Sequence, residues 1–265
     1  NYSENNTVIA CAARTKTKAT EFANKFDIKY IYNNYNQLVE NEEVDIIYVG
    51  TIHKCHYPHV KLCLEHDKHV LCEKPLTIND LQANILAKIA KKRKLFFMEA
   101  MWTRFFPLYQ YLKYDIDSIT NTTMLKSIGN IQKIDCTFGF KGPIEVKRLW
   151  LKDYTGGGLL DIGIYPISFT FWCMNGIEPD EIKAQAILTE NEQIDSEGHI
   201  ELIYSDYKVI STIHYSFNEE LPNEWVIKGQ DGQITIKGWA HCATQLEITY
   251  DDPQRPSVFK KFQLP

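Results

Sequence analysis

The feature that most constrains the fold is a change in hydrophobic period partway along the chain. Between Val8 and Glu99, apolar runs of strand length alternate with segments whose apolar residues recur at helical spacing. Such alternation is typical of a parallel sheet covered by helices. The predicted strands are 8–13, 44–49, 69–72 and 95–99, and the predicted helices are 17–26, 58–65 and 81–93. Residues 1–104 are therefore predicted to form a doubly wound, Rossmann-type α/β domain.

After about Leu125, runs with strand character dominate. Asp231-Gly232 separates two of them and predicts a hairpin, because these residues readily adopt the positive φ of a tight turn. Residues 105–265 are therefore predicted to form an α+β domain with a mostly antiparallel, open-faced sheet. The predicted strands are 128–140, 182–188, 200–204, 209–215, 225–227, 234–236 and 246–250.

Composition excludes some classes of function. The 265 residues carry a formal net charge of −5, so the chain lacks the basic footprint of a nucleic-acid-binding protein. The tight basic cluster at 91–94 falls where a helix is predicted to end, and there it complements the helix dipole. The seven cysteines include no Cys-x-x-Cys pair, and no signal peptide or membrane-spanning apolar stretch is evident. We therefore expect a cytoplasmic protein without a membrane or nucleic-acid partner.

A lysine directly follows the apolar run 69–72, in the tripeptide Glu73-Lys74-Pro75. Ligands of open α/β sheets bind beyond the carboxyl ends of the strands, so Lys74 is predicted to project into a ligand crevice. Pro75 fixes its own φ and disfavours helical backbone at Lys74, which gives the lysine a stiff support. The alternative is a solvated lysine in a surface turn.

The glycine-rich turn of a dinucleotide-binding domain is not found here. Such a domain begins with a strand and a Gly-x-Gly-x-x-Gly turn whose amides bind pyrophosphate, whereas the first glycine of this chain is Gly50. Residues 1–7 resemble the end of the helix that follows such a turn, so 8–13 is predicted to be the second strand. On this interpretation the first strand and its Gly-rich loop are missing, and residues 1–265 alone are expected to be inactive.

Arg14 and Thr15 follow the predicted strand 8–13, at the place where an acidic residue would bind the adenosine ribose of NAD. An arginine with hydroxyl and cationic neighbours suits the 2′-phosphate of NADP instead. NADP is therefore the predicted cofactor. The alternative is a solvated arginine before a helix.

Three histidines, His53, His56 and His59, follow the strand 44–49, with Cys55 among them. Their spacing raises the question of zinc. A closed zinc site usually gathers ligand pairs from separate segments, and no second cluster is evident, so no metal is predicted. Surface or helix-capping histidines are an alternative.

Three motifs, in this order, resemble the glucose-fructose oxidoreductase/inositol dehydrogenase (Gfo/Idh/MocA) family. They are EKP at 73–75, MEAMWTRFFP at 98–107 and GGGLLDIGIY at 156–165. Residues 51–56 also resemble the family's Thr-Pro-Asn-x-x-His loop, although Ile52 and His53 replace its Pro and Asn. Many relatives have His where this chain has Tyr165.

The resemblance implies roles for the matching residues. It implies catalytic roles for Lys74, Asp161 and Tyr165; cofactor contacts for Arg14, Thr15, Thr51, His53, His56, Glu73 and Lys74; and substrate contacts for Trp102, Phe138, Tyr165 and Trp239.

The catalytic roles follow a simple chemical requirement. A tyrosine with an ordinary pKa near 10 is a poor base at neutral pH, so the Lys74 ammonium is expected to lower the pKa of Tyr165. Asp161 lies four residues before Tyr165 on the same predicted helix face and would orient the pair. Pro166 inside that pattern suggests a kink. Taken singly, a helix-start carboxylate and packed aromatics would be ordinary structural residues.

The expected function is that of an NADP-dependent dehydrogenase that acts on CH–OH groups. The resemblance implies hydride transfer from a cyclic trans-diol or an aldopyranose, such as a dihydrodiol or D-xylose, and a homodimer formed through the second-domain sheet. A related sugar or inositol dehydrogenase is an alternative that a substrate panel would distinguish. A non-catalytic NADP-binding regulatory protein is another, favoured if the natural protein also lacks the Gly-rich loop.

Overall fold

The computed structural model describes residues 6–115 and 123–264. The chain divides into two compact units, Asn1–Ala100 (unit 1) and Met101–Pro265 (unit 2). Each unit has its own hydrophobic core, and each is described by itself below.

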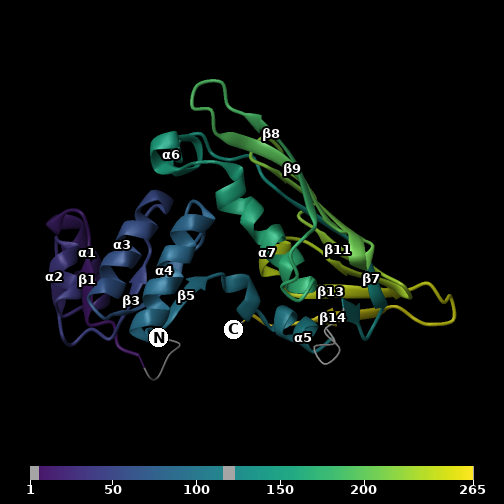
Figure 1. The fold of residues 1–265 in the computed structure, drawn as a ribbon, viewed down its shortest axis with the longest axis horizontal. Coiled ribbons are helices and arrows are strands. Elements are labelled where there is room, and N and C mark those ends of the chain that lie inside the picture. Colours follow the sequence, from purple (N-terminus) through teal and green to yellow (C-terminus); the bar gives the residue numbers. More distant parts are fainter. Residues whose placement is uncertain (1–5, 116–122, 265) are drawn as a thin grey trace. The chain divides into compact units, whose positions relative to one another are not determined.

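Unit 1 alternates strands and helices (Figure 1), which confirms the predicted parallel α/β class. Its strands form two parallel sheets, of order β1–β2 and β3–β4–β5. The strands are β1 (Ala10–Ala12), β2 (Tyr30–Tyr32), β3 (Ile46–Val49), β4 (His69–Glu73) and β5 (Phe97–Ala100). The helices are α1 (Lys16–Phe26), α2 (Tyr35–Val39), α3 (His53–Glu65) and α4 (Asp80–Arg93). The hydrophobic pattern does not predict β2 and α2, both of which are short.

The core of unit 1 explains why the run before Lys74 is apolar. Strand β4 lies between β3 and β5 and pairs with both. Val70 and Cys72 of this strand are fully buried, in one cluster with Leu64 of α3 and Leu86 of α4. A central parallel strand enclosed in this way carries few polar side chains, so Glu73 and Lys74 appear only where the strand ends.

The start of α3 differs from the prediction. Helix α3 begins at His53 rather than Pro58, and Pro58 lies inside it. Helix α4 is capped by Asn79, whose side chain accepts a hydrogen bond from the amide of Gln82 at 3.0 Å.

Unit 2 is built on one mixed sheet of order β14–β13–β12–β11–β7–β10–β9–β8, with β6 paired to β7. Among the described strands of unit 2, only the pair β7–β10 is parallel, which confirms a mostly antiparallel sheet. The strands are β6 (Met124–Leu125), β7 (Gly129–Gly139), β8 (Glu181–Leu188), β9 (Asp195–Tyr204), β10 (Val209–Ser216), β11 (Trp225–Gly229), β12 (Gly232–Ile236), β13 (Gln245–Tyr250) and β14 (Val258–Lys261). The sequence analysis missed β6 and β14, whereas the predicted hairpin at Asp231-Gly232 joins β11 to β12.

One face of this sheet carries the core. Helix α7 (Ile164–Cys173) packs there, and Phe169 of the helix lies against Trp225 of β11 with ring centroids 4.5 Å apart. Helix α5 (Pro107–Asp115) supplies Leu108 and Leu112 to the same cluster. Strand side chains alternate between the two faces, so the intervening residues of β7, β9 and β10 form a second face, which we call the open face.

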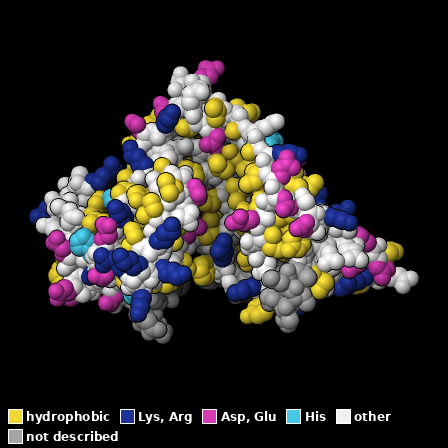
Figure 2. Space-filling model, in the orientation of Figure 1, with side chains coloured by type: hydrophobic (Ala, Val, Ile, Leu, Met, Phe, Trp, Pro, Cys, Tyr) yellow, Lys and Arg dark blue, Asp and Glu magenta, His cyan; other side chains and the backbone are white. Residues whose placement is uncertain are grey.

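The surface is mixed in charge. Lysine and arginine side chains stand among aspartate and glutamate on the visible face of unit 1 (Figure 2). Among the described residues, no helix is both long and apolar enough to cross a membrane.

Candidate active site

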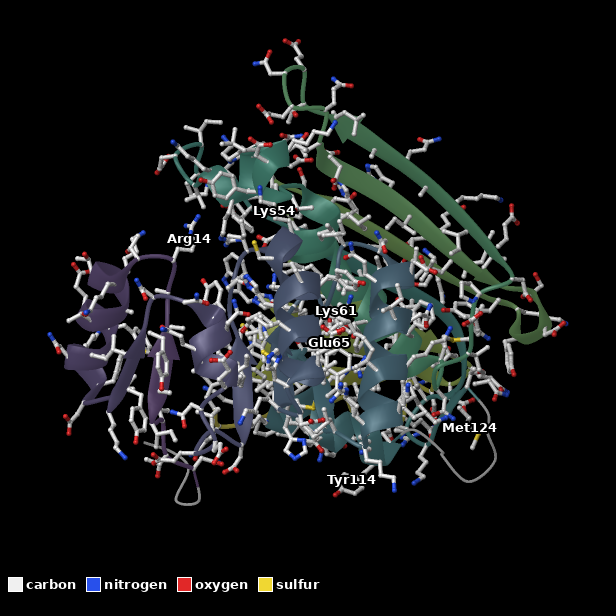
Figure 3. All side chains as sticks on the ribbon, turned by 60° about the vertical axis from the view of Figure 1, so that its left-hand side comes forward. Arg14, Lys54, Lys61, Glu65, Tyr114 and Met124 are labelled. Carbon is white, nitrogen blue, oxygen red and sulfur yellow. The ribbon has the colours of Figure 1, made fainter. Side chains whose placement is uncertain are left out.

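The first part of the candidate site lies at the carboxyl ends of the parallel strands of unit 1. Arg14 follows β1, Thr51 follows β3 and Lys74 follows β4. Figure 3 shows Arg14 and Lys54 at the same end of this unit, whereas Lys61 and Glu65 lie further along α3. Parallel strands place their carboxyl ends at one edge, which is where this class of sheet binds ligands.

The turn at Lys74 is held by hydrogen bonds to its main chain. Glu73 Oε2 accepts the amide hydrogen of Lys74 at 3.1 Å, and Glu99 Oε1 of β5 accepts that of Leu76 at 2.7 Å. The Lys74–Pro75 peptide bond is cis. Glu73 Oε1 also accepts a hydrogen bond from the Tyr48 hydroxyl at 2.5 Å, and burial together with this bond raises the pKa of Tyr48. Glu73, a predicted cofactor ligand, thus organises the turn in this structure.

His56 ties two segments of unit 1 together. Its ring is fully buried, with Nδ1 2.6 Å from the Pro75 carbonyl oxygen and Nε2 2.8 Å from the Thr51 carbonyl oxygen. Both ring nitrogens thus face main-chain carbonyl oxygens, one on each side of the ring. In this structure His56 therefore positions the chain around Lys74. Both ring nitrogens are engaged with the main chain here, and the contact between His56 and the cofactor stays a prediction.

The remaining predicted residues of the 51–59 segment lie at the start of α3. The Thr51 hydroxyl is 3.1 Å from His59 Nδ1, and burial, then the charge of His56, lowers the pKa of His59. His53 is the first residue of α3, with its ring centroid 5.8 Å from that of His56. Thr51 and His53 stand at the carboxyl end of β3, as the cofactor role predicted for them requires.

The end of β1 is suited to an anion. Thr15 caps α1, whose first turn contains no acidic residue and begins with Lys16. Arg14 is exposed and lies near Tyr35: burial raises the pKa of Tyr35, while the charge of Arg14 acts in the opposite direction. A guanidinium and a hydroxyl at a helix amino terminus are favourable partners for a phosphate. The residues present therefore fit the 2′-phosphate of NADP.

Tyr165 is the centre of an aromatic cluster in unit 2. Its hydroxyl accepts a hydrogen bond from Trp102 Nε1 at 2.6 Å, and the Phe138 ring lies 5.8 Å from the Tyr165 ring. Trp239 meets Phe138 edge-on at 6.2 Å. The structure thus gathers the four residues predicted to contact substrate. It adds His241, which stacks on Phe138 at 4.5 Å and which no motif had indicated.

Asp161 has a partner that the sequence analysis did not identify. Arg148 of α6 (Lys147–Trp150) donates a hydrogen bond from Nη1 to Asp161 Oδ1 at 2.8 Å, and the carboxylate is almost completely buried. A buried carboxylate needs such a cation, because desolvation disfavours its charge. Arg148 is about half exposed, so its guanidinium also faces solvent.

The helix that carries Asp161 and Tyr165 is not a continuous α-helix. Residues Leu159–Gly163 form a π-helical segment, and α7 follows it. Pro166 has no amide hydrogen to donate within this stretch, which is one established cause of such an irregularity. Gly157 enters the segment with φ of +130°, and a Cβ there would lie 2.3 Å from Asp195 Oδ1, so only glycine fits.

Comparisons with known proteins identify the family of this chain. Residues 1–101 match the model of an oxidoreductase family with an NAD-binding Rossmann fold, and residues 125–235 match the Gfo/Idh/MocA C-terminal domain. The trans-1,2-dihydrobenzene-1,2-diol dehydrogenase of Danio rerio is 34% identical over 253 residues, which is 96% of this chain and 73% of the relative. That of Bos taurus is 38% identical over 249 residues, or 94% and 71%.

Solved structures share the fold. A 3-ketoreductase mutant from Actinomadura kijaniata, in complex with TDP-benzene and NADP, superposes with a TM-score of 0.82 at 22% identity, covering 97% of this chain and 76% of that one. An aldose-aldose oxidoreductase from Caulobacter crescentus gives 0.83 at 18% identity, covering 98% and 76%. The family models and the relatives together establish that this chain belongs to the Gfo/Idh/MocA family of NAD(P)-dependent oxidoreductases.

Proposed function

We propose that this protein is an NADP-dependent dehydrogenase that oxidises a CH–OH group of a cyclic trans-diol or an aldopyranose. The observation that carries the proposal is the hydroxyl of Tyr165, which accepts a hydrogen bond from Trp102 and whose ring lies beside that of Phe138. The relatives of this chain support it, because they are dihydrodiol dehydrogenases. Flat apolar walls suit the face of a ring-shaped substrate, and a single fixed hydroxyl can exchange a proton with its alcohol.

Proton transfer is the part of the reaction assigned to this chain's own residues. Bound NADP would supply the hydride acceptor. The Tyr165 oxygen would remove the hydroxyl proton of the substrate, and the Lys74 ammonium would stabilise the ionised tyrosine and the substrate oxygen. Trp102 already donates to the Tyr165 oxygen, and a hydrogen bond of this kind favours the ionised form. Asp161, whose charge is paired with Arg148, would orient Lys74 and Tyr165. The proposal requires both units to present these groups to one substrate.

We further propose a homodimer formed through the open face of unit 2, in a reducing cytoplasm. Ile210 and Phe259 expose 43% and 63% of their surface, and strand alternation places both on the open face. All seven cysteines are free thiols.

Sedimentation should give twice the chain mass of 30.8 kDa, and Ile210→Glu should shift the mass towards one chain. A single-chain mass at micromolar concentration would contradict the dimer.

The catalytic pair can be tested by substitution in the protein as its gene encodes it. Tyr165→Phe should lower kcat about a hundredfold to ten-thousandfold, because it keeps the ring and removes the ionisable oxygen. Lys74→Met should cost at least as much. Since the two groups act as a unit, the double variant should be little worse than the worse single one. The measurement is steady-state oxidation of a panel of cyclic diols, aldoses and inositols.

Tyr207→Phe is the matched control, because this exposed tyrosine lies on the short 3-10 turn Ser205–Tyr207 and should leave kcat unchanged. A near-normal kcat for Tyr165→Phe between about pH 6 and 10, which brackets the pKa range of a tuned tyrosine, would refute the tyrosine base. The tyrosine base would also be refuted if the fold-losses in kcat of Lys74→Met and Tyr165→Phe multiplied in the double variant.

The cofactor preference rests on Arg14. Arg14→Ala should weaken NADP binding about 10- to 100-fold and NAD binding little, because it removes a charge-assisted hydrogen bond to the 2′-phosphate. Fluorescence titration with both cofactors measures the difference. Lys25→Ala removes a charge from the last turn of the same helix and should change neither affinity. Equal losses for NADP and NAD would show that Arg14 does not read the phosphate.

The turn at Lys74 can be tested through Glu99. Glu99→Ala leaves the Leu76 amide without its acceptor, at a local cost of about 1–3 kcal/mol, so kcat should fall while the NADP dissociation constant is retained. Glu99→Gln keeps an acceptor oxygen and should preserve most of kcat. Hydrogen exchange at Leu76 should speed up in the alanine variant alone. Unchanged exchange and unchanged kcat would show that this bond does not position Lys74.

A further inference from the structure

One buried side chain lies against both ends of the π-helical segment Leu159–Gly163. The ring of Tyr215, from β10, lies beside Gly158, which precedes the segment, and beside Gly163, its last residue. A Cβ at Gly158 would lie 2.8 Å from the ring carbons Cδ2 and Cε2 of Tyr215, and one at Gly163 would lie 3.0 Å from Cδ1. A larger residue at either position would therefore push the segment away from the ring.

The Tyr215 hydroxyl and the first turn of the segment share one acceptor. Asp195 Oδ2, at the start of β9, accepts a hydrogen bond from the Tyr215 hydroxyl at 2.9 Å and from the Leu159 amide at 2.6 Å. Burial, followed by the charge of Asp195 and this hydrogen bond, raises the pKa of Tyr215, so its hydroxyl stays protonated and remains a donor. One carboxylate oxygen thus joins β9 and β10 to the residue that begins the segment.

The strand next to Tyr215 makes room for its ring. Gly198 of β9 is the direct cross-strand partner of Tyr215, and a Cβ at Gly198 would overlap the Tyr215 hydroxyl oxygen. Tyr215 belongs to the core cluster of unit 2 and is 2% exposed, so these contacts lie on the core face of the sheet and away from the open face. Close packing on this face leaves the ring one position.

The register of the π-helical segment matters for the candidate active site. A π turn holds one residue more than an α turn, and such turns are rare and occur frequently at functional sites. Asp161 lies within the segment, and Tyr165 lies two residues after its end. Loss of the extra residue would rotate Tyr165 relative to Asp161 by about 100°, the angle between successive residues of an α-helix. The Tyr165 hydroxyl would then leave its place beside Trp102.

We propose that Tyr215 and Asp195 are positioning residues for Tyr165, which hold the π-helical segment in the register that directs the Tyr165 hydroxyl towards Trp102. The inference rests on the proposed function, in which this hydroxyl exchanges a proton with the substrate. The sequence analysis assigned no role to Tyr215 or Asp195, because both lie outside the three motifs and meet the segment only through the sheet register.

Substitutions in the protein as its gene encodes it test the kinetic consequence. Asp195→Ala leaves two donors without their acceptor and lets the segment move, and a displacement of about 1 Å at the reacting oxygen should lower kcat on the order of 100-fold. Asp195→Asn keeps an acceptor oxygen for both donors and should retain most of kcat. Tyr215→Phe keeps the ring and removes one hydrogen bond, so kcat should fall about 2- to 10-fold. The NADP dissociation constant should not change, because Arg14 and its neighbours lie in unit 1.

Tyr204→Phe is the matched control. Tyr204 is a buried tyrosine of β9, and its hydroxyl has no hydrogen-bond partner within the part of the chain that the structure describes. Its removal should leave kcat unchanged. An equal fall in kcat for Asp195→Asn and Asp195→Ala, or a fall for Tyr204→Phe as large as for Tyr215→Phe, would overturn the proposal.

A second measurement reports the position of Tyr165 without turnover. The indole N–H of Trp102 donates to the Tyr165 oxygen, so its ¹⁵N–¹H signal, identified by its loss in Trp102→Phe, depends on where that oxygen lies. We expect the signal to shift and exchange at the Leu159 amide to speed up in Asp195→Ala, and neither to change in Tyr204→Phe.

Thermal unfolding shows whether each variant is folded. If Asp195→Ala does not fold, Tyr215→Phe decides, and an unchanged Trp102 signal in the folded variant would overturn the proposal. The two levels of inference stay distinguishable. A shifted Trp102 signal in the variants, together with an unaltered protein that oxidises none of the tested alcohols, would support the positioning of Tyr165 and refute the proposed dehydrogenase function.

Discussion

The position of Lys74 depends on hydrogen bonds that side chains make to the main chain around it. Glu73 and Glu99 accept the amides of Lys74 and Leu76, and His56 bonds the carbonyl between them. These side chains come from β4, β5 and α3, so neighbouring elements all constrain one short turn. Because His56 and Pro75 are buried, displacing the turn would leave polar groups without partners, and that is costly in a protein interior. Glu73, Glu99 and His56 therefore fix the main chain from which the Lys74 side chain projects.

Tyr165 is positioned mainly by aromatic packing, whereas the turn at Lys74 is held by hydrogen bonds to the main chain. Its ring is enclosed by Trp102, Phe138 and His241, and its hydroxyl accepts a hydrogen bond from the indole N–H of Trp102. Aromatic packing limits the ring to one orientation, and the hydrogen bond then fixes the oxygen. The π-helical segment before α7 sets the direction from which this side chain enters the cluster. A buried tyrosine oxygen held by a donor is a reasonable starting point for acid–base chemistry.

The two faces of the unit 2 sheet differ in the side chains that they carry. On the core face, large apolar residues such as Trp225 and Phe169 stabilise the unit by burial. On the open face, Glu197 forms hydrogen bonds with several donors while isolated apolar residues such as Ile210 remain exposed. A face of this kind combines polar groups that are hydrogen-bonded to one another with apolar side chains that are exposed. Because successive side chains of a strand point to opposite faces, one sheet can have an apolar face and a mixed polar face.

The sequence by itself determined the fold class, because hydrophobic period is a local property. It predicted the parallel α/β alternation of unit 1, the mostly antiparallel sheet of unit 2 and the lysine that ends β4. It placed the start of α3 too late, at Pro58, and it missed short strands such as β2 and β14. Only the tertiary structure decided that His56 bonds Pro75, that Arg148 pairs with Asp161, and that His199 stacks on His214. Those contacts join residues 13 to 19 positions apart, and they depend on strand register and side-chain packing, which no local pattern encodes.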